Sequence, residues 1–215
     1  MALPGPAGGR LNRFLAGQFA RPRGAAGRLL LGPLLDWIGA PMMDAAFDVL
    51  EPRAGEAVLD LGIGGGALSA RLLRAGVQLT GVDPSEVMLA RAAGRHRAAV
   101  RDGQARFLVG SASALPLADA AVHKAASVNT VYFWEDPGQG MAELSRVLRP
   151  GGRLVLGFQT ADAVRAWPGH VHGFRAWEEA ELVAAVEGAG FAIEGIRAGH
   201  DRRVRDYRTL IALRG

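Results

Sequence analysis

The sequence predicts an α/β protein with a doubly wound, mainly parallel sheet. An apolar run at residues 57–61 leads into glycines at positions 62, 64 and 66, a pattern typical of a strand that enters a tight turn. Apolar runs with strand character then alternate with helical patterns along the chain. The last two expected strands follow each other without a helix between them. We therefore expect layered helices around one sheet, closed by a hairpin.

The expected elements follow in order from periodicity and from start and stop signals. Seven strands are predicted at residues 57–61, 78–82, 106–109, 122–128, 153–158, 191–197 and 207–213. Four helices are predicted at residues 67–75, 85–93, 141–148 and 178–187. Pro84 suits a helix start, and the run Pro150-Gly151-Gly152 is a strong stop signal.

The first 45 residues predict a helical extension ahead of a main domain at residues 46–215. Residues 1–9 lack periodicity and read as a tail. Between residues 11 and 50 apolar side chains recur at helical spacing, and Pro22, Pro33 and Pro41 divide this stretch, so we expect three short helices. They form either a cap over the site or a layer packed on the surface; an amphipathic helix on a membrane surface is a third alternative.

Composition narrows the class of protein. The chain has 215 residues, 49% of them hydrophobic, which suffices for one buried core. It has no cysteine, which excludes disulfides and thiolate chemistry, and no apolar run near the ~20 residues of a membrane span. We expect a cytoplasmic bacterial protein; the basic, acid-free N-terminus also resembles a transit peptide. A formal charge of +4, almost all from arginine, makes nucleic acid an unlikely partner.

The glycine-rich turn indicates a nucleotide-like ligand. Asp60 precedes Gly62 by two residues, and its carboxylate would repel a pyrophosphate but accept hydrogen bonds from amino or hydroxyl groups. Asp83 ends the second expected strand, where Rossmann-like folds place an acid on a ribose diol. This arrangement favours a neutral or cationic ligand over a dinucleotide.

These residues resemble the class I S-adenosylmethionine-dependent methyltransferases of the small-molecule type, whose signature is an acid two residues before G-x-G-x-G and an acid after the second strand. Here the motifs read Asp60-Leu-Gly-Ile-Gly-Gly-Gly66 and Gly81-Val-Asp83. The resemblance covers about residues 46–213. It implies a Rossmann-like seven-stranded sheet with strand 7 antiparallel between strands 5 and 6, and S-adenosylmethionine as cofactor.

The resemblance also implies a set of cofactor-binding residues. Those around the methionine part and the ribose are Asp60, Gly62, Ile63, Gly64, Gly66, Asp83 and Asn129. Those around the adenine are Pro84, Met88, Ser111 and Ala112. Ser111 stands where the family usually has an acid that receives the adenine amino group, so charge assistance is reduced there. Met88 reads equally well as a core contact.

Acceptor residues are expected after the fourth and fifth strands. The aromatic side chains predicted to bind substrate are Tyr132, Phe133, Trp134 and Trp167, with core packing as the alternative. The predicted catalytic residues are Tyr132 and the two histidines of the long connector, His170 and His172. The alternatives for the histidines are solvated loop residues or a metal pair, and we expect no metal.

The predicted activity is methyl transfer to a small, apolar or aromatic acceptor, of quinone type or from secondary metabolism. Three alternatives stay open: an RNA or protein methyltransferase, a fold relative that uses the cofactor for other chemistry, and a non-catalytic binding protein. His123 and Lys124 start the fourth strand, on the edge away from the site, and read as surface residues. The sequence does not determine the oligomeric state.

Overall fold

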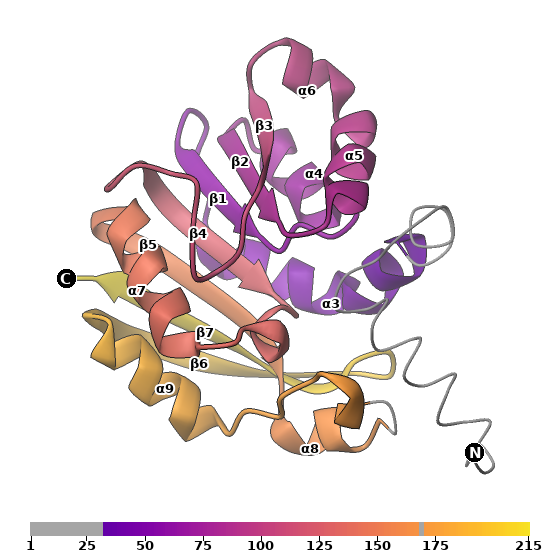
Figure 1. Ribbon diagram of the computed structural model, residues 1–215, viewed down its shortest axis with the longest axis vertical. Helices are drawn as coiled ribbons and strands as arrows, with labels where there is room; N and C mark the ends of the chain where they lie inside the picture. Colours follow the sequence, from indigo (N-terminus) through magenta and orange to yellow (C-terminus); the bar gives the residue numbers. More distant parts are fainter. Residues whose placement is uncertain (1–31, 168–169) are drawn as a thin grey trace.

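The computed structural model describes residues 32–167 and 170–215, which form one seven-stranded sheet with helices on both faces (Figure 1). The sheet order is β3-β2-β1-β4-β5-β7-β6, and β7 runs antiparallel to both of its neighbours. The strands are β1 (Ala57–Leu61), β2 (Gln78–Asp83), β3 (Ala105–Val109), β4 (Val122–Val128), β5 (Leu148–Gln159), β6 (Phe191–Asp201) and β7 (Arg205–Arg214). The predicted fold class is confirmed.

The two faces of the sheet bury alternate residues of the same strands. Helices α7 (Pro137–Val147) and α9 (Glu179–Gly188) cover one face and pack with Leu59 and Leu154. Helices α3 (Gly32–Leu50) and α4 (Ala67–Arg74) cover the other face and pack with Val58 and Val155 (Figure 1). Because successive side chains of a strand point to opposite faces, each central strand needs apolar residues throughout.

The remaining helices occur in the segments that connect successive strands along the chain. They are α5 (Glu86–Arg95), α6 (Arg97–Arg101), α8 (Ala161–Arg165) and the 3₁₀ turns η2 (Val131–Phe133) and η3 (His170–His172). Helix α7 begins four residues before the expected position, because Asp136 accepts hydrogen bonds from the backbone of Gly138 and Gln139 and Pro137 occupies the first helical position.

The N-terminal extension departs from the prediction. Instead of separate short helices after Pro33 and Pro41, α3 is one helix of 19 residues that contains Pro41 and continues past the expected boundary at residue 45. Proline lacks the N–H that would bond to the carbonyl of Trp37, four residues earlier. Arg203 Nη1 donates to that carbonyl instead, at 3.2 Å. The first of the three expected helices lies outside the described residues.

Strands β6 and β7 continue four and two residues beyond the expected spans, so their hairpin extends over the edge where the parallel strands end. That edge carries the carboxyl ends of β1, β2, β4 and β5, and α3 passes beside it (Figure 1). Among residues 32–167 and 170–215 there is no helix with the length and apolar character needed to cross a bilayer.

Candidate functional site

The glycine-rich turn between β1 and α4 is shaped by backbone conformations that favour glycine. Gly62, Gly64 and Gly66 have φ of +77°, +49° and +80°. A Cβ on Gly62 would lie 2.2 Å from Cγ2 of Thr130, so the turn after β1 packs directly on the turn after β4. Nothing lies within 4 Å of a Cβ position on Gly64, which leaves that part of the turn open to a ligand.

Asp60 is the buried carboxylate beneath this turn. It is 2% exposed, and Ser69 Oγ donates to its Oδ2 at 2.7 Å. Burial raises the pKa of Asp60 to about 7, opposed by the Ser69 hydrogen bond and reinforced by the negative charge of Asp83. A cationic group bound beside Asp60 would stabilise its ionised form, because opposite charges attract strongly where water is excluded.

Asp83 ties the end of β2 to the same turn. Its Oδ2 accepts from the backbone N–H of Gly64 at 3.1 Å, and its Oδ1 accepts from Ser85 at 2.8 Å. The backbone N–H of Gly62 donates to Val82 at 2.7 Å. These contacts place the two predicted acids on adjacent strands at one edge of the sheet, on either side of the glycine turn. Ile63 in the turn is itself buried.

The predicted adenine-binding residues divide by exposure. Pro84 is partly exposed, whereas Met88 is 1% exposed and belongs to the interior. Ser111 is partly exposed and its Oγ lies 3.0 Å from Oγ of Ser113, while Ala112 is buried. Pro84 and Ser111 therefore offer surface to a ligand, whereas the burial of Met88 fits the core contact that the sequence left open as its alternative.

Asn129 directly follows β4 and has a left-handed backbone conformation, with φ of +59°. Its N–H donates to Gly157 at 2.8 Å, and its Oδ1 accepts from the hydroxyl of Tyr132 at 3.2 Å. Its Nδ2 lies 3.5 Å from the Cβ position on Gly39 of α3. Non-glycine residues with positive φ are uncommon, and the role of Asn129 in cofactor binding stays a prediction.

Tyr132 occupies a position that argues against the predicted catalytic and substrate-binding roles. It is 4% exposed, its hydroxyl donates to Asn129, and the same oxygen accepts from the N–H of Gln159. Burial raises the pKa of Tyr132 above its ordinary value, so the phenol stays protonated. Tyr132 holds Asn129 in place from the interior.

Aromatic side chains gather around Phe174, a residue that the sequence did not single out. Its ring centroid lies 4.6 Å from that of Phe133 and 4.9 Å from that of Trp167, both edge to face. These three rings are partly exposed, and we call them the aromatic cluster. Trp134 lies elsewhere: its ring is 2.6 Å from the Cβ position on Gly140 of α7.

The two predicted histidines lie in η3, beside the aromatic cluster, and both are partly exposed. Nδ1 of His170 lies 2.8 Å from the carbonyl oxygen of Trp167, which can only accept, so Nδ1 carries the proton and Nε2 keeps its lone pair. Within the described ranges, no group of three or more histidines and carboxylates could hold a metal ion.

Asp36 of α3 joins the glycine turn to α5, a link that sequence reasoning missed. Its Oδ2 accepts from Arg91 Nη2 at 3.1 Å and from Arg95 Nη1 at 2.9 Å. The same oxygen lies 2.7 Å from the Cβ position on Gly65, and Arg95 also donates to the Gly65 carbonyl at 3.3 Å. Asp36 is the first acid in the sequence, but its partners lie more than 50 residues away and no local pattern reveals them.

His123 and Lys124, expected on the surface, are half-buried at the opposite edge of the sheet. Nζ of Lys124 lies 2.9 Å from Glu56, and only 12% of its side chain is exposed. Nδ1 of His123 accepts from the N–H of Ala57 at 3.0 Å. Both lie at the predicted edge and remain partly exposed, and both pack against the segment that enters β1.

Comparisons with known proteins agree with this geometry. A family model described as a methyltransferase domain matches residues 59–156. An uncharacterized methyltransferase of Mycobacterium tuberculosis is 42% identical over 122 residues, which make up 57% of this chain and 47% of that protein. The uncharacterized methyltransferase YdaC of Bacillus subtilis is 32% identical over 139 residues, 64% of this chain and 72% of YdaC.

A third relative carries a more specific name. The ubiquinone/menaquinone biosynthesis C-methyltransferase UbiE of Roseobacter denitrificans is 40% identical over 119 residues, 53% of this chain and 46% of UbiE. The chain thus spans about half the length of the first curated relatives that it matches.

Solved structures share the fold. A chain of the Haloferax volcanii complex between the Trm112 methyltransferase activator and a methyltransferase superposes with a TM-score of 0.75 at 22% identity, covering 85% of this chain and 92% of that one. A geranyl diphosphate methyltransferase in complex with GPP and sinefungin has a TM-score of 0.70 at 17% identity, covering 82% and 78%. At such identities the likeness concerns the fold.

Proposed function

The chain belongs to the class I S-adenosylmethionine-dependent methyltransferases, and on this premise we propose that it methylates a small, apolar or aromatic molecule. The observation that carries the proposal is the pair of buried acids at the glycine turn. Asp60 and Asp83 are 2% and 7% exposed and lie at the ends of adjacent strands. Burying two carboxylates close together is costly without a ligand that uses them, which favours a ligand with an amino group and a diol.

The described residues fit S-adenosylmethionine. Asp60 would accept from the amino end of the methionine part, Asp83 from the ribose hydroxyls, and Asn129 would lie beside the reacting end. When bound, the cofactor supplies an activated methyl group on a sulfonium. The chain's own contribution is to orient the acceptor in line with that methyl group and to exclude water, since the leaving sulfur is neutral and needs no protonation.

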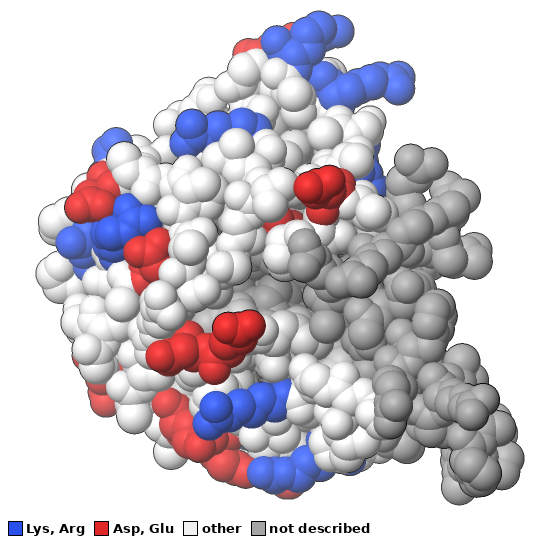
Figure 2. Space-filling model, viewed as in Figure 1, with Lys and Arg blue, Asp and Glu red and all other residues white. Residues whose placement is uncertain are grey.

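The acceptor class rests on the aromatic cluster. Phe133, Trp167 and Phe174 present partly exposed rings on the edge where β4 and β5 end. Aromatic surface of this kind suits an apolar or aromatic molecule. The name of UbiE, a quinone-biosynthesis methyltransferase, supports a quinone-type acceptor. Basic and acidic side chains are interspersed on the face in Figure 2, which favours a small molecule over nucleic acid.

We assign the general base, where the acceptor needs one, to Nε2 of His170. Its tautomer is set by the Trp167 carbonyl, so the lone pair on Nε2 is free to take a proton from an acceptor hydroxyl. His172 is the matched control in the same turn. We expect His170→Ala to lower kcat for a phenolic acceptor by about tenfold or more, and His172→Ala to lower it less. Equal loss in both variants would contradict the assignment.

Calorimetry and a methyl-transfer assay with simple hydroquinones and phenols test the proposal. Asp83→Ala should weaken S-adenosylmethionine binding by about tenfold or more, because a charge-assisted hydrogen bond contributes roughly 1.5–3 kcal/mol. The control is Asp102→Ala, which removes an exposed carboxylate directly after the last residue of α6. Wild-type affinity in Asp83→Ala would refute the cofactor placement. Transfer to RNA but to none of the phenols would refute the acceptor class.

A further inference from the structure

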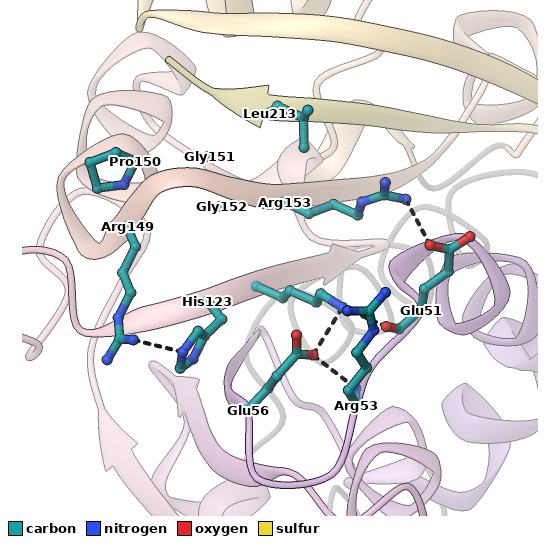
Figure 3. A pocket seen from close by; sticks show the side chains of 11 residues that line it. Glu51, Arg53, Glu56, His123, Arg149, Pro150, Gly151, Gly152, Arg153 and Leu213 are labelled. Carbon is teal, nitrogen blue, oxygen red and sulfur yellow. Dashed lines mark hydrogen bonds and ion pairs between the residues drawn. The ribbon is translucent and has the colours of Figure 1, made fainter.

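A hollow lies at the opposite edge of the sheet from the glycine turn, where β1, β4 and β5 begin (Figure 3). It has a volume of about 420 Å³ and is lined by the segment before β1, the first residues of β4 and the turn at the start of β5. The proposed methyl transfer uses none of these residues. The hollow therefore calls for an explanation of its own.

The carboxylates of this hollow already have cationic partners. Glu56 lies 2.9 Å from Nζ of Lys124, and Glu51 lies 3.7 Å from Nη1 of Arg153. The pKa of Glu56 is lowered: burial alone would raise it, but the hydrogen bonds from Lys124 and the Arg53 backbone outweigh that effect. Each acid thus lies beside a cation, and Arg153 is shared with Glu194, whose carboxylate lies 3.1 Å from its Nη2.

Two arginines of the hollow remain without a carboxylate. Arg53 and Arg149 line the hollow, and neither forms an ion pair among residues 32–167 and 170–215. The Arg149 guanidinium instead donates from Nε to the carbonyl of Ala120 at 3.2 Å and points Nη1 at His123 (Figure 3). With Glu194 counted as a second partner of Arg153, the hollow accordingly carries an excess of one positive charge.

His123 makes this excess chemically specific. Its Nδ1 accepts from the N–H of Ala57 at 3.0 Å, and its Nε2 lies 2.6 Å from Nη1 of Arg149. A backbone N–H and a guanidinium can only donate, yet a neutral imidazole has a single acceptor nitrogen. Because Ala57 begins β1 and its N–H is fixed there, Nδ1 is the acceptor and Nε2 carries the proton. Two donors, from His123 and Arg149, then face each other with no acceptor between them.

We propose that this hollow binds the phosphate group of a small ligand. A phosphate oxygen could accept from both donors once the Arg149 guanidinium moves out of its present 2.6 Å approach to His123 Nε2, and this would resolve their mismatch. Arg53 and Arg149 have no carboxylate partner within the described ranges, and the planar guanidinium fits phosphate oxygens in a bidentate manner. The site is separate from the methyl-transfer site and does not depend on its assignment.

Titration calorimetry of the full chain with inorganic phosphate, against chloride of equal ionic strength, tests the proposal. Arg53→Ala and Arg149→Ala should each weaken phosphate binding by about tenfold or more, since each removes a charge-assisted contact. Arg97→Ala is the matched control, because it removes an exposed arginine on α6. Phosphate binding no tighter than chloride, or equally weakened by Arg97→Ala, overturns the site; citrate binding as tightly as phosphate overturns the ligand class.

Nuclear magnetic resonance of the histidine rings gives a readout that misfolding cannot imitate. Phosphate should shift the Nε2 signal of His123 in the wild type and in Arg97→Ala, and shift it far less in Arg53→Ala. Arg53 is exposed, so its removal leaves the fold intact, and S-adenosylmethionine affinity should stay unchanged. An unmoved His123 signal at saturating phosphate would refute the proposal, whatever becomes of the proposed methyl transfer.

Discussion

The carboxylate of Asp60 illustrates how one buried charge couples stability to ligand binding. It lies under the glycine turn with hydrogen bonds from the side chain and the backbone of Ser69, and with a second carboxylate, Asp83, on the neighbouring strand. Burial and like charge disfavour its ionised form in the free protein. A bound cationic group reverses that preference, so binding and deprotonation strengthen each other.

We expect the stability of the free protein to fall as pH rises through the window that Asp60 defines. Burial raises the pKa of Asp60 from its ordinary value of 3.8 to about 7, so between these values the unfolded chain loses its proton first and folding weakens. Asp60→Asn keeps an acceptor for Ser69 but cannot ionise. Relative to the wild type, its free energy of unfolding should rise across this window, by roughly 4 kcal/mol at most.

Urea unfolding at a series of pH values measures this difference. Asp102→Asn, on the exposed surface, should show no such trend and controls for unspecific charge effects. A difference between Asp60→Asn and the wild type that stays constant from pH 4 to pH 8 would show that Asp60 ionises normally in the fold, contrary to its burial.

Among the elements, the turns after β1 and β4 and the helix α3 depend on single contacts. Gly62 accommodates Thr130, and Arg203 of the β6–β7 hairpin supplies the hydrogen bond that Pro41 removes from α3. Arg203 also lies over the ring of Trp37, at 5.4 Å from its centroid. In both places a residue distant in sequence completes an element that local propensity leaves incomplete.

Gly62→Ala should destabilise the protein by roughly 1–3 kcal/mol or more, through positive φ and the clash with Cγ2 of Thr130. Thr130→Ser removes that methyl group. The double variant should therefore lose less free energy of unfolding than the sum of the losses in Gly62→Ala and Thr130→Ser. Gly188→Ala, at the end of α9 with open space around it, should be neutral or mildly stabilising. Strict additivity in thermal unfolding would rule out the clash.

Arg203→Ala should lower the free energy of unfolding by roughly 0.5–1.5 kcal/mol, because the carbonyl of Trp37 loses its donor. In a Pro41→Ala background the restored N–H at position 41 can take over that carbonyl, so the same substitution should cost less. Double-mutant unfolding measures this coupling. The control is Arg202→Ala, which removes the exposed arginine next to Arg203 in the sequence. An equal loss of stability from Arg203→Ala in both backgrounds would contradict the explanation.

At the scale of the whole molecule, the sheet separates two chemically different edges. The carboxyl ends of the strands carry the acids, glycines and aromatic cluster of the proposed methyl-transfer site, and the opposite edge carries the basic hollow (Figures 1 and 3). Helix α3 runs from one edge to the other: Asp36 in its first part contacts the glycine turn, and Glu51, just beyond its end, lines the hollow.

Asp36→Ala should loosen the glycine turn, because Asp36 is the acceptor that joins α3 to Arg91 and Arg95. We expect amide exchange at residues 62–66 to accelerate by about tenfold, and S-adenosylmethionine to reverse most of the change. Asp162→Ala removes a carboxylate that is 97% exposed and serves as control. Unchanged exchange at the turn would mean that α3 packs on the site without stabilising it.

The sequence by itself determined the sheet, the place of each strand along the chain and the positions of Asp60, Asp83 and Asn129, whereas β5, β6 and β7 extend beyond their expected spans. Strand periodicity, glycines and the acids that follow strands are local signals, and parallel strands bring their carboxyl ends together without further information. The same locality explains the failures. Pro41 predicted a helix end because its rescue by Arg203 comes from 162 residues away.

Only the tertiary structure decided which of the singled-out side chains are buried and which contacts they make. The buried hydroxyl of Tyr132 forms hydrogen bonds with Asn129 and Gln159. Phe174 packs against Phe133 in the aromatic cluster, and Asp36 binds Arg95, which also contacts the glycine turn. The donor mismatch between His123 and Arg149 likewise exists only where β1, β4 and β5 begin side by side. Hydrogen-bond partners and exposure depend on contacts between distant segments, and a sequence pattern records only the neighbours along the chain.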